Sequence, residues 1–261
     1  MRSLICNGIC NGICNGIRNG TRIRLICTGL SLATFLATAD TPPAFADDFT
    51  LIQQGFVQQG FVQQGIAAQN AGNYADAEAA YRAAIAQEPQ NATHYYNLGN
   101  ALSAQGKISE AIAQYQTTLQ LDPQNADAYY NLGYWLNIQE RKIDAIAAYR
   151  QAIKLQPFNA DTYYNLGVLL REQGQLNEAE IILRRALLLN DTNVGAYSNL
   201  SNVLIAQRRF VEAEALLRRG LQYLPRNANL YYELARALEA QGRTAEATAA
   251  YEIVRQLSLK P

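Results

Sequence analysis

The sequence predicts an all-α solenoid, and three observations support this. The string Tyr-Tyr-Asn-Leu-Gly begins at Tyr95, Tyr129 and Tyr163, so it recurs every 34 residues. Degenerate copies begin at Tyr197 and Tyr231. Around each copy, apolar residues follow the spacing of amphipathic helices. A period of this length indicates one supersecondary unit stacked on copies of itself, because a single unit cannot bury its own apolar face.

The composition is that of a folded protein that does not bind nucleic acid. Of 261 residues, 49% are hydrophobic and 17% are charged. Residues 1–46 contain four Arg and one Asp, so the remainder carries 18 basic and 21 acidic groups and a formal charge of −3. This balance argues against a nucleic-acid partner. All four cysteines lie in the first 27 residues, which leaves no thiol chemistry for the rest of the chain.

The N-terminal segment has the pattern of a secretory signal peptide. Four arginines precede an apolar run from Leu25 to Ala39, and Ala44-Phe45-Ala46 supplies a small-x-small cleavage site. We expect cleavage after Ala46 and export by the general secretory route to a periplasm or equivalent lumen. The alternative is an uncleaved anchor, but the run has 15 residues, whereas a spanning helix needs about 20. Residues 1–46, with their low-complexity leader, form this signal, and residues 47–57 form a short lead-in.

The remaining chain divides into six units of 34 residues without a gap. Their bounds are 58–91, 92–125, 126–159, 160–193, 194–227 and 228–261. In each unit the apolar spacing predicts two helices, as with Tyr95, Leu98 and Leu102 in one and Ile112, Tyr115 and Leu119 in the next. The first helix of the first unit is the least secure, because Gly60 lies in it and glycine costs about 1 kcal/mol relative to alanine.

Turn and cap residues recur at fixed positions of the unit. Between the two helices a glycine permits a left-handed backbone in four units, and Glu140 and Arg208 replace it in units three and five. After the second helix, a proline that ends it is followed two residues later by an asparagine that we expect to cap the next helix. The glycines are Gly72, Gly106, Gly174 and Gly242, the prolines Pro89, Pro123, Pro157 and Pro225, and the caps Asn91, Asn125, Asn159, Asn193 and Asn227.

One position of the second helix is alanine in all six units, which predicts a close helix crossing. We expect a glycine of the first helix to be its partner there. The alanines are Ala77, Ala111, Ala145, Ala179, Ala213 and Ala247, and the glycines are Gly65, Gly99, Gly133 and Gly167.

This pattern of an aromatic residue, Leu-Gly, a spaced Gly, Ala, Tyr, Ala and Pro at period 34 resembles the tetratricopeptide repeat, over residues 58–261. The resemblance implies a right-handed superhelix of antiparallel helix pairs, in which the first helices line a concave groove.

No catalytic arrangement is recognisable. His94 is the only histidine, and we expect it to be a surface residue in the first turn of a helix. The chain has no P-loop, dinucleotide fingerprint or His-Glu-x-x-His motif. The sequence therefore predicts no enzyme activity, no metal, no cofactor and no small-molecule substrate.

The resemblance places a neutral row of tyrosine and asparagine side chains in the groove. Asparagine can pair with both the C=O and the N–H of an extended peptide, and tyrosine adds apolar area with a polar tip. An asparagine ladder of this kind is similar to that in the repeat domains of certain glycosyltransferases. The candidates are Tyr96, Tyr130, Tyr164, Tyr232, Asn97, Asn131, Asn165, Asn199, Asn100, Tyr134 and Asn202.

The alternative is that these residues only pack, with each asparagine bonding a neighbouring helix. For Tyr95, Tyr129, Tyr163, Tyr197 and Tyr231 we expect core packing. A second binding mode of the family, a clamp for a carboxylate, needs Lys and Arg in successive units and is not predicted. Arg236 and Glu233 are isolated charges, and the arginine pairs at 184/185, 208/209 and 218/219 are expected on a solvated face.

Two functions remain open at this stage. The first is an exported, non-catalytic scaffold that binds an extended segment of another protein in its groove. The second is a structural or assembly role, through contacts to a membrane complex or through self-association by an apolar patch at Val254, Leu257 and Leu259.

Overall fold

The computed structural model describes residues 12–18, 21–27 and 60–259. The chain divides into two compact units, Met1–Gln105 (unit 1) and Gly106–Pro261 (unit 2), which are described separately. The apolar run beyond Cys27, the expected cleavage site at Ala46 and the lead-in at 47–57 lie outside the described residues.

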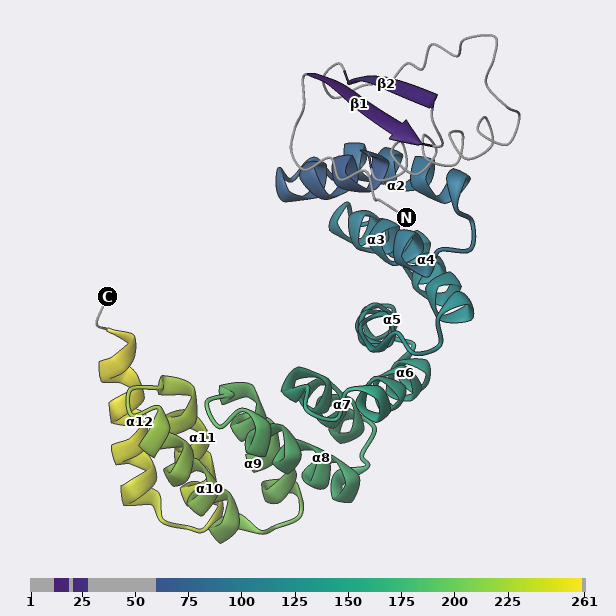
Figure 1. Cartoon of the computed structure of the whole chain (residues 1–261). Coiled ribbons are helices and arrows are strands. Elements are labelled where there is room, and N and C mark those ends of the chain that lie inside the picture. The colour runs from purple at the N-terminus through teal and green to yellow at the C-terminus, as the bar shows by residue number, and fades with distance from the viewer. Residues whose placement is uncertain (1–11, 19–20, 28–59, 260–261) are drawn as a thin grey trace. The chain divides into compact units, whose positions relative to one another are not determined.

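Unit 1 contains a β-hairpin that the sequence analysis did not predict. Strand β1 (Gly12–Arg18) pairs in antiparallel with β2 (Thr21–Cys27), with Arg18 opposite Thr21 (Figure 1). The two residues between the strands are Asn-Gly, which is the strongest short signal for a two-residue hairpin loop. The repeat region, residues 60–259, is all-α, as predicted.

The helical part of unit 1 consists of residues 60–70, α2 (Tyr74–Gln87) and α3 (Ala92–Ala104). The Tyr81 ring of α2 is buried, and its hydroxyl donates a hydrogen bond of 3.2 Å to the Gln69 side chain. The predicted first helix therefore forms despite its glycines, because Tyr81 packs against it.

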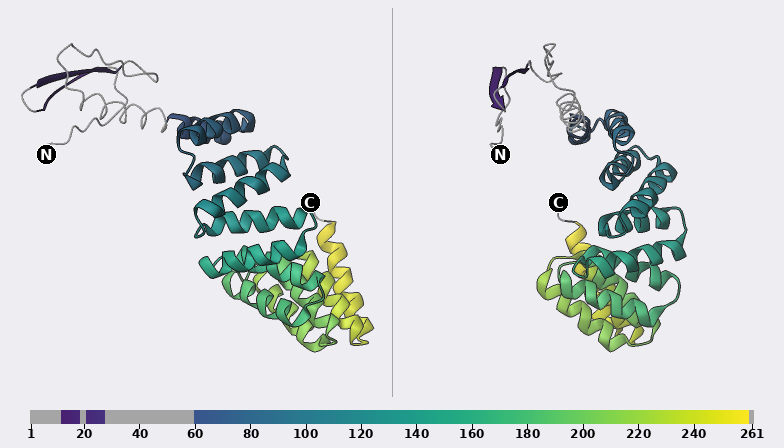
Figure 2. Two further views of the ribbon diagram at one scale, coloured as in Figure 1. Left: turned by 90° about the vertical axis from the view of Figure 1, so that its right-hand side faces the viewer. Right: turned by 45° about the vertical axis from the view of Figure 1, so that its right-hand side comes forward.

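Unit 2 is a stack of helices in which each helix contacts the next along the chain (Figures 1 and 2). Helix α7 also contacts α9, and α9 contacts α11. We call α5, α7, α9 and α11 the first helices of unit 2, and α4, α6, α8, α10 and α12 its second helices. Their bounds are α4 Ile108–Leu121, α5 Ala126–Ile138, α6 Lys142–Leu155, α7 Ala160–Glu172, α8 Leu176–Leu189, α9 Val194–Ala206, α10 Phe210–Tyr223, α11 Ala228–Ala240 and α12 Thr244–Ser258.

The predicted turns and caps are confirmed. The four turn glycines have φ between 73° and 76°, and Glu140 and Arg208 adopt the same left-handed backbone with φ of 58° and 61°. Each of the five predicted asparagine caps accepts a hydrogen bond from a backbone N–H in the first turn of its helix. Helices α2, α4, α6 and α10 each end two residues before the predicted proline.

The invariant alanines are buried, but the nearest side chains to three of the four predicted glycines are larger residues. All six alanines are at most 1% exposed. A Cβ added to Gly65 would lie 2.5 Å from the Tyr81 ring, and one added to Gly133 would lie 3.0 Å from the Tyr149 ring. A Cβ added to Gly167 would lie 2.6 Å from Cγ of the Leu183 side chain. The glycine therefore makes room for a large side chain one turn after the alanine.

Core packing holds for only part of the expected tyrosine set. Tyr163 and Tyr197 are buried, at 8% and 1% exposure. Tyr95, Tyr129 and Tyr231 are half-buried, so they pack against the core only in part. At Tyr95 the hydroxyl reaches the surface, where it donates a 3.0 Å hydrogen bond to the Pro89 carbonyl.

Candidate functional site

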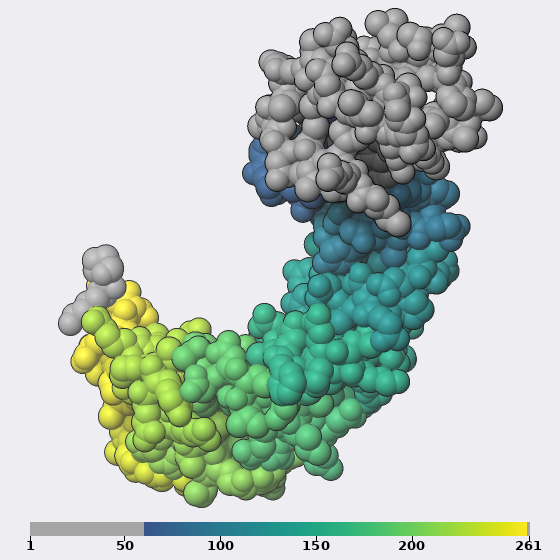
Figure 3. Space-filling view, in the orientation of Figure 1, coloured from purple at the N-terminus to yellow at the C-terminus, as the bar shows by residue number. Residues whose placement is uncertain are grey.

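The first helices of unit 2 carry the candidate groove. Figure 3 shows unit 2 hollowed on the side of α5, α7 and α9, and the contacts of α9 with both α7 and α11 make this face continuous. Residues at the same position of successive units therefore lie on neighbouring helices. The predicted site residues in unit 2 come together on this face, which we call the groove.

Asn165 bridges two first helices. Its Nδ2 donates a hydrogen bond of 3.2 Å to the hydroxyl of Tyr130. The Tyr130 ring packs against Tyr149 of α6, with centroids 5.9 Å apart and planes tilted by 59°. Burial raises the pKa of Tyr130, and the negative charge of Asp161 raises it further, whereas the hydrogen bond from Asn165 lowers it. Burial raises the pKa of the Tyr149 phenol, and a hydrogen bond with the Asn165 side chain lowers it. Among the described residues, no group donates a hydrogen bond to the Asn165 Oδ1.

Asn199 and Asn202 of α9 are bonded to neighbouring helices. The Oδ1 of Asn199 accepts a hydrogen bond of 2.9 Å from Arg171 Nε, and its Nδ2 donates one of 2.8 Å to the Gly195 carbonyl. The Oδ1 of Asn202 accepts one of 2.7 Å from Arg236, which also pairs with Glu233 at 2.7 Å. For these two asparagines the structure supports the packing alternative.

Arg171 is a groove residue that the sequence analysis missed. It lies in the last turn of α7, and its side chain is 33% exposed. The signal was available, because Arg171 is seven residues after Tyr164, which is two helical turns, and therefore faces the same side of α7. Since its Nε donates a hydrogen bond to Asn199, Arg171 fixes the orientation of that side-chain amide and is not an isolated charge.

Three tyrosines give the groove its apolar area. Tyr134 and Tyr232 are 41% and 48% exposed. Tyr134 contacts Trp135 edge-on at 4.9 Å, and Tyr232 packs against Tyr251 at 5.8 Å. The Tyr164 ring lies against the backbone of Gly195, where an added Cβ would be 2.6 Å from its hydroxyl. Rings held in this way can bind a partner without losing much conformational freedom.

The remaining predicted site residues are half-buried. Asn131 lies on α5 of unit 2, and Tyr96, Asn97 and Asn100 lie on α3 of unit 1. Asn131, Tyr96 and Asn100 each already have an interaction within the chain. These three side chains therefore also contribute to the structure.

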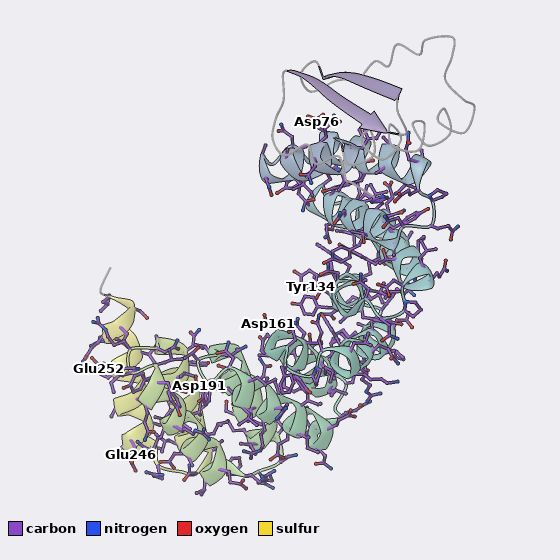
Figure 4. The ribbon with its side chains drawn as sticks, in the orientation of Figure 1. Asp76, Tyr134, Asp161, Asp191, Glu246 and Glu252 are labelled. Carbon is purple, nitrogen blue, oxygen red and sulfur yellow. The ribbon has the colours of Figure 1, made fainter. Side chains whose placement is uncertain are left out.

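Two carboxylates of the groove have no cationic partner. Asp127 and Asp161 are exposed in the first turns of α5 and α7. Neither forms an ion pair within the part of the chain that the structure describes. Figure 4 shows Asp161 and Tyr134 on the hollowed side, on neighbouring helices.

The predicted solvated arginines lie on the second helices and turns, where Arg184, Arg209 and Arg218 form ion pairs. Glu180 of α8 accepts hydrogen bonds from Arg184 at 3.0 Å and from Arg209 at 2.5 Å. Arg218 and Arg243 pair in the same way with Glu214 of α10, at 2.8 and 2.5 Å. The pairs of Arg209 with Glu180 and of Arg243 with Glu214 connect successive repeats.

His94 is buried, so the expectation of a surface residue was wrong. It is 4% exposed, its Nε2 lies 3.3 Å from the Glu88 carboxylate, and its Nδ1 has no partner among the described residues. The equivalent residues 34, 68, 102 and 136 positions later, which are Ala128, Thr162, Ala196 and Leu230, are at most 1% exposed. The small or apolar residues at the same position of the later repeats were the sequence signal that His94 is buried.

The helical residues 60–259 show neither a metal site nor a membrane span. They contain no group of three His, Cys, Asp or Glu side chains placed to hold a metal ion. None of their helices combines the length and apolar composition that a membrane span requires.

Comparison with solved structures gives likenesses at low sequence identity. YrrB, described as a TPR protein with an unusual peptide-binding site, is 24% identical with a TM-score of 0.61, over 68% of this chain and 91% of YrrB. A tetratricopeptide repeat protein from Parabacteroides merdae is 22% identical with a TM-score of 0.65, over 78% of this chain and 80% of that one. PilW, described as a widely conserved type IV pilus biogenesis factor, is 20% identical with a TM-score of 0.61, over 77% and 92%. At these identities the likeness concerns the fold.

Comparison with curated protein sequences gives no match. Comparison with sequence-family models identifies the repeat. Four family models, each described as tetratricopeptide repeat, match residues 62–126 and 96–142, 126–159, 148–181 and 204–256. Together they cover most of the helical region. The chain therefore belongs to the tetratricopeptide-repeat family of protein–protein interaction scaffolds.

Proposed function

We propose that this protein is an exported, non-catalytic scaffold that holds an extended segment of another protein in the groove of unit 2. The observation that carries the proposal is the state of Asn165. Its amide nitrogen donates a hydrogen bond to Tyr130. In the proposed complex, its carbonyl oxygen accepts a hydrogen bond from a backbone N–H of the bound segment. Exposed rings at Tyr134 and Tyr232 supply apolar contact on either side.

The absence of a recognisable catalytic group supports the non-catalytic part. The single histidine is buried beside Glu88, and no cysteine lies beyond residue 27. Export is proposed from the arginine-rich, apolar N-terminal segment and its small-x-small site. The peptide-binding description of YrrB is consistent with a segment bound on this fold.

The test is partner capture with two matched double variants. Asn131→Ala with Asn165→Ala removes two groove amides, whereas Gln116→Ala with Gln151→Ala removes two exposed amides of the second helices α4 and α6. Tagged chains are used to capture proteins from the compartment into which the protein is exported, and thermal midpoints are measured in parallel. We expect the groove variant to lose its captured partners while the control retains them. Equal capture by both variants, with similar midpoints, would contradict the proposal.

An assembly role through self-association is a second candidate. On α12 the side chains of Val254 and Leu257 are half-buried, and Leu259 is 74% exposed. Light scattering of the exported form at tens of micromolar checks this role. A dimer or larger species that Leu259→Ser reduces to a monomer would support it, and a monomer at that concentration would exclude it.

A further inference from the structure

The groove is chemically uneven, and its α5–α7 end combines carboxylates with aromatic rings. Asp127, Tyr130 and Tyr134 follow one another on α5 at helical spacing, and Asp161 and Tyr164 repeat the first two positions on α7. We call these five residues the tyrosine–aspartate surface. Figure 4 shows its labelled members, Tyr134 and Asp161, on the same hollowed side.

Several cations of the surrounding helices pair with other carboxylates. Arg141 pairs with Asp144 at 2.7 Å, Lys142 with Glu172 at 2.9 Å, and Arg150 with Glu178 at 2.8 Å. Arg171 donates to Asn199 instead. Within the described chain, the negative charge of Asp127 and Asp161 is therefore not offset by an ion pair.

Asp161 acts on the rings directly. It lies one helical turn before Asn165, whose amide is bonded to the Tyr130 hydroxyl at 3.2 Å. Its negative charge raises the pKa of Tyr130, after the larger effect of burial. The aromatic and acidic groups of the two helices thus form one surface.

We propose that the tyrosine–aspartate surface binds a lysine or arginine side chain of the partner segment. The inference rests on the proposed function and names the chemistry of its partner. A cation over a tyrosine face is attracted by the ring quadrupole, and the carboxylates add Coulomb attraction. The aliphatic stem of the same side chain covers the exposed Tyr134 ring. Arg171 lies in the last turn of α7, at the opposite end of that helix from Asp161, and is bonded to Asn199 of α9. Arg236 lies on α11. The basic side chain therefore binds at the first turns of α5 and α7, which carry the two aspartates.

The experiment uses the full chain and three fluorescein-labelled peptides of equal length. They repeat Lys-Leu-Ser, Gln-Leu-Ser or Glu-Leu-Ser, and fluorescence anisotropy gives their affinities at low salt. The test variant is Asp127→Asn with Asp161→Asn. The control, Asp76→Asn with Glu252→Gln, removes the same charge from α2 and α12, where both carboxylates are labelled in Figure 4.

We expect the lysine peptide to bind at least about tenfold more tightly than the glutamine peptide. The test variant should lose this preference and the control should retain it. No lysine preference, or a preference that survives in the test variant, would overturn the inference.

The same peptides distinguish failure of this inference from failure of the proposed function. If the lysine and glutamine peptides bind equally well and Asn131→Ala with Asn165→Ala abolishes the binding of both, the groove binds peptides without regard to charge, and only the inference fails. If no peptide binds in a manner that depends on Asn165, both fail.

Discussion

The side chain of Asn165 on α7 donates a 3.2 Å hydrogen bond to the hydroxyl of Tyr130 on α5. The two residues are 35 positions apart, so the bond joins adjacent repeats through their groove faces. One interaction thereby contributes both to the stacking of repeats and to the orientation of a peptide-binding amide.

Tyr130→Phe removes this bond and keeps the ring. We expect a loss of about 1 kcal/mol in the free energy of unfolding, which is typical of one net hydrogen bond. Urea unfolding measures the change. Tyr134→Phe is the control, since the Tyr134 hydroxyl has no hydrogen bond among the described residues, and it should change stability by less than about 0.5 kcal/mol. Equal effects of the two substitutions would show that the bond contributes nothing.

Arg208→Gly should stabilise the protein. Arg208 has a φ of 61°, a left-handed conformation that costs a non-glycine residue roughly 1–2 kcal/mol. Glycine removes this cost but loses more entropy on folding, so we expect a net gain of about 0.5–1 kcal/mol in urea unfolding. Gly174→Ala, at the equivalent turn with a φ of 73°, should change stability in the opposite direction. A loss of stability in Arg208→Gly would mean that the arginine side chain makes a compensating contact.

Gly167→Ala tests the close packing of α7 against α8. The added Cβ would lie 2.6 Å from Leu183 Cγ, in a buried position. We expect a loss of roughly 1–3 kcal/mol from overpacking, which exceeds the gain in helix propensity of about 1 kcal/mol. Calorimetry should show a lower midpoint for Gly167→Ala. A midpoint equal to or above that of the parent would indicate that Leu183 moves aside without cost.

Glu180 makes stability depend on acid pH. The hydrogen bond from Arg209 lowers the pKa of Glu180, and Arg184 contributes in the same direction. Because the folded-state pKa lies below the unfolded value of about 4.3, the folded protein binds fewer protons. The contribution is complete above the unfolded pKa and is lost as the pH falls through the folded pKa. Glu180→Gln should therefore be less stable than the parent at pH 7, and the difference should shrink at about pH 3. A difference that stays constant between these pH values in urea unfolding would contradict this assignment.

The repeat sequence predicted those features that depend on local chemistry. The glycine turns, the asparagine caps and the helix ends before proline follow from backbone preferences of single residues. Gly133 shows where this reasoning stops, because its neighbour is the ring of Tyr149 on another helix, and an invariant alanine nearby was the more obvious partner. Side-chain contacts depend on how two helices cross, and their spacing along the chain does not specify the crossing.

The groove shows the same limit. Its position on the first helices was implied by the family resemblance, but the role of each asparagine depends on its neighbours. Asn199 occupies the repeat position of Asn165, and Asn202 occupies that of Asn100, yet arginines of α7 and α11 hold their acceptor oxygens. The partner of each amide comes from another repeat, and such pairs vary between repeats even where the consensus does not.

Site-specific photocrosslinking tests the central claim most directly. A photoreactive phenylalanine analogue replaces either Tyr134 on the first helix α5 or Tyr223 on the second helix α10, which are exposed to a similar extent, 41% and 45%. After irradiation in the protein's own compartment, adducts are detected by electrophoresis and identified by mass spectrometry. We expect partner adducts from position 134 and none from position 223. Adducts from position 223 alone would contradict binding in the groove.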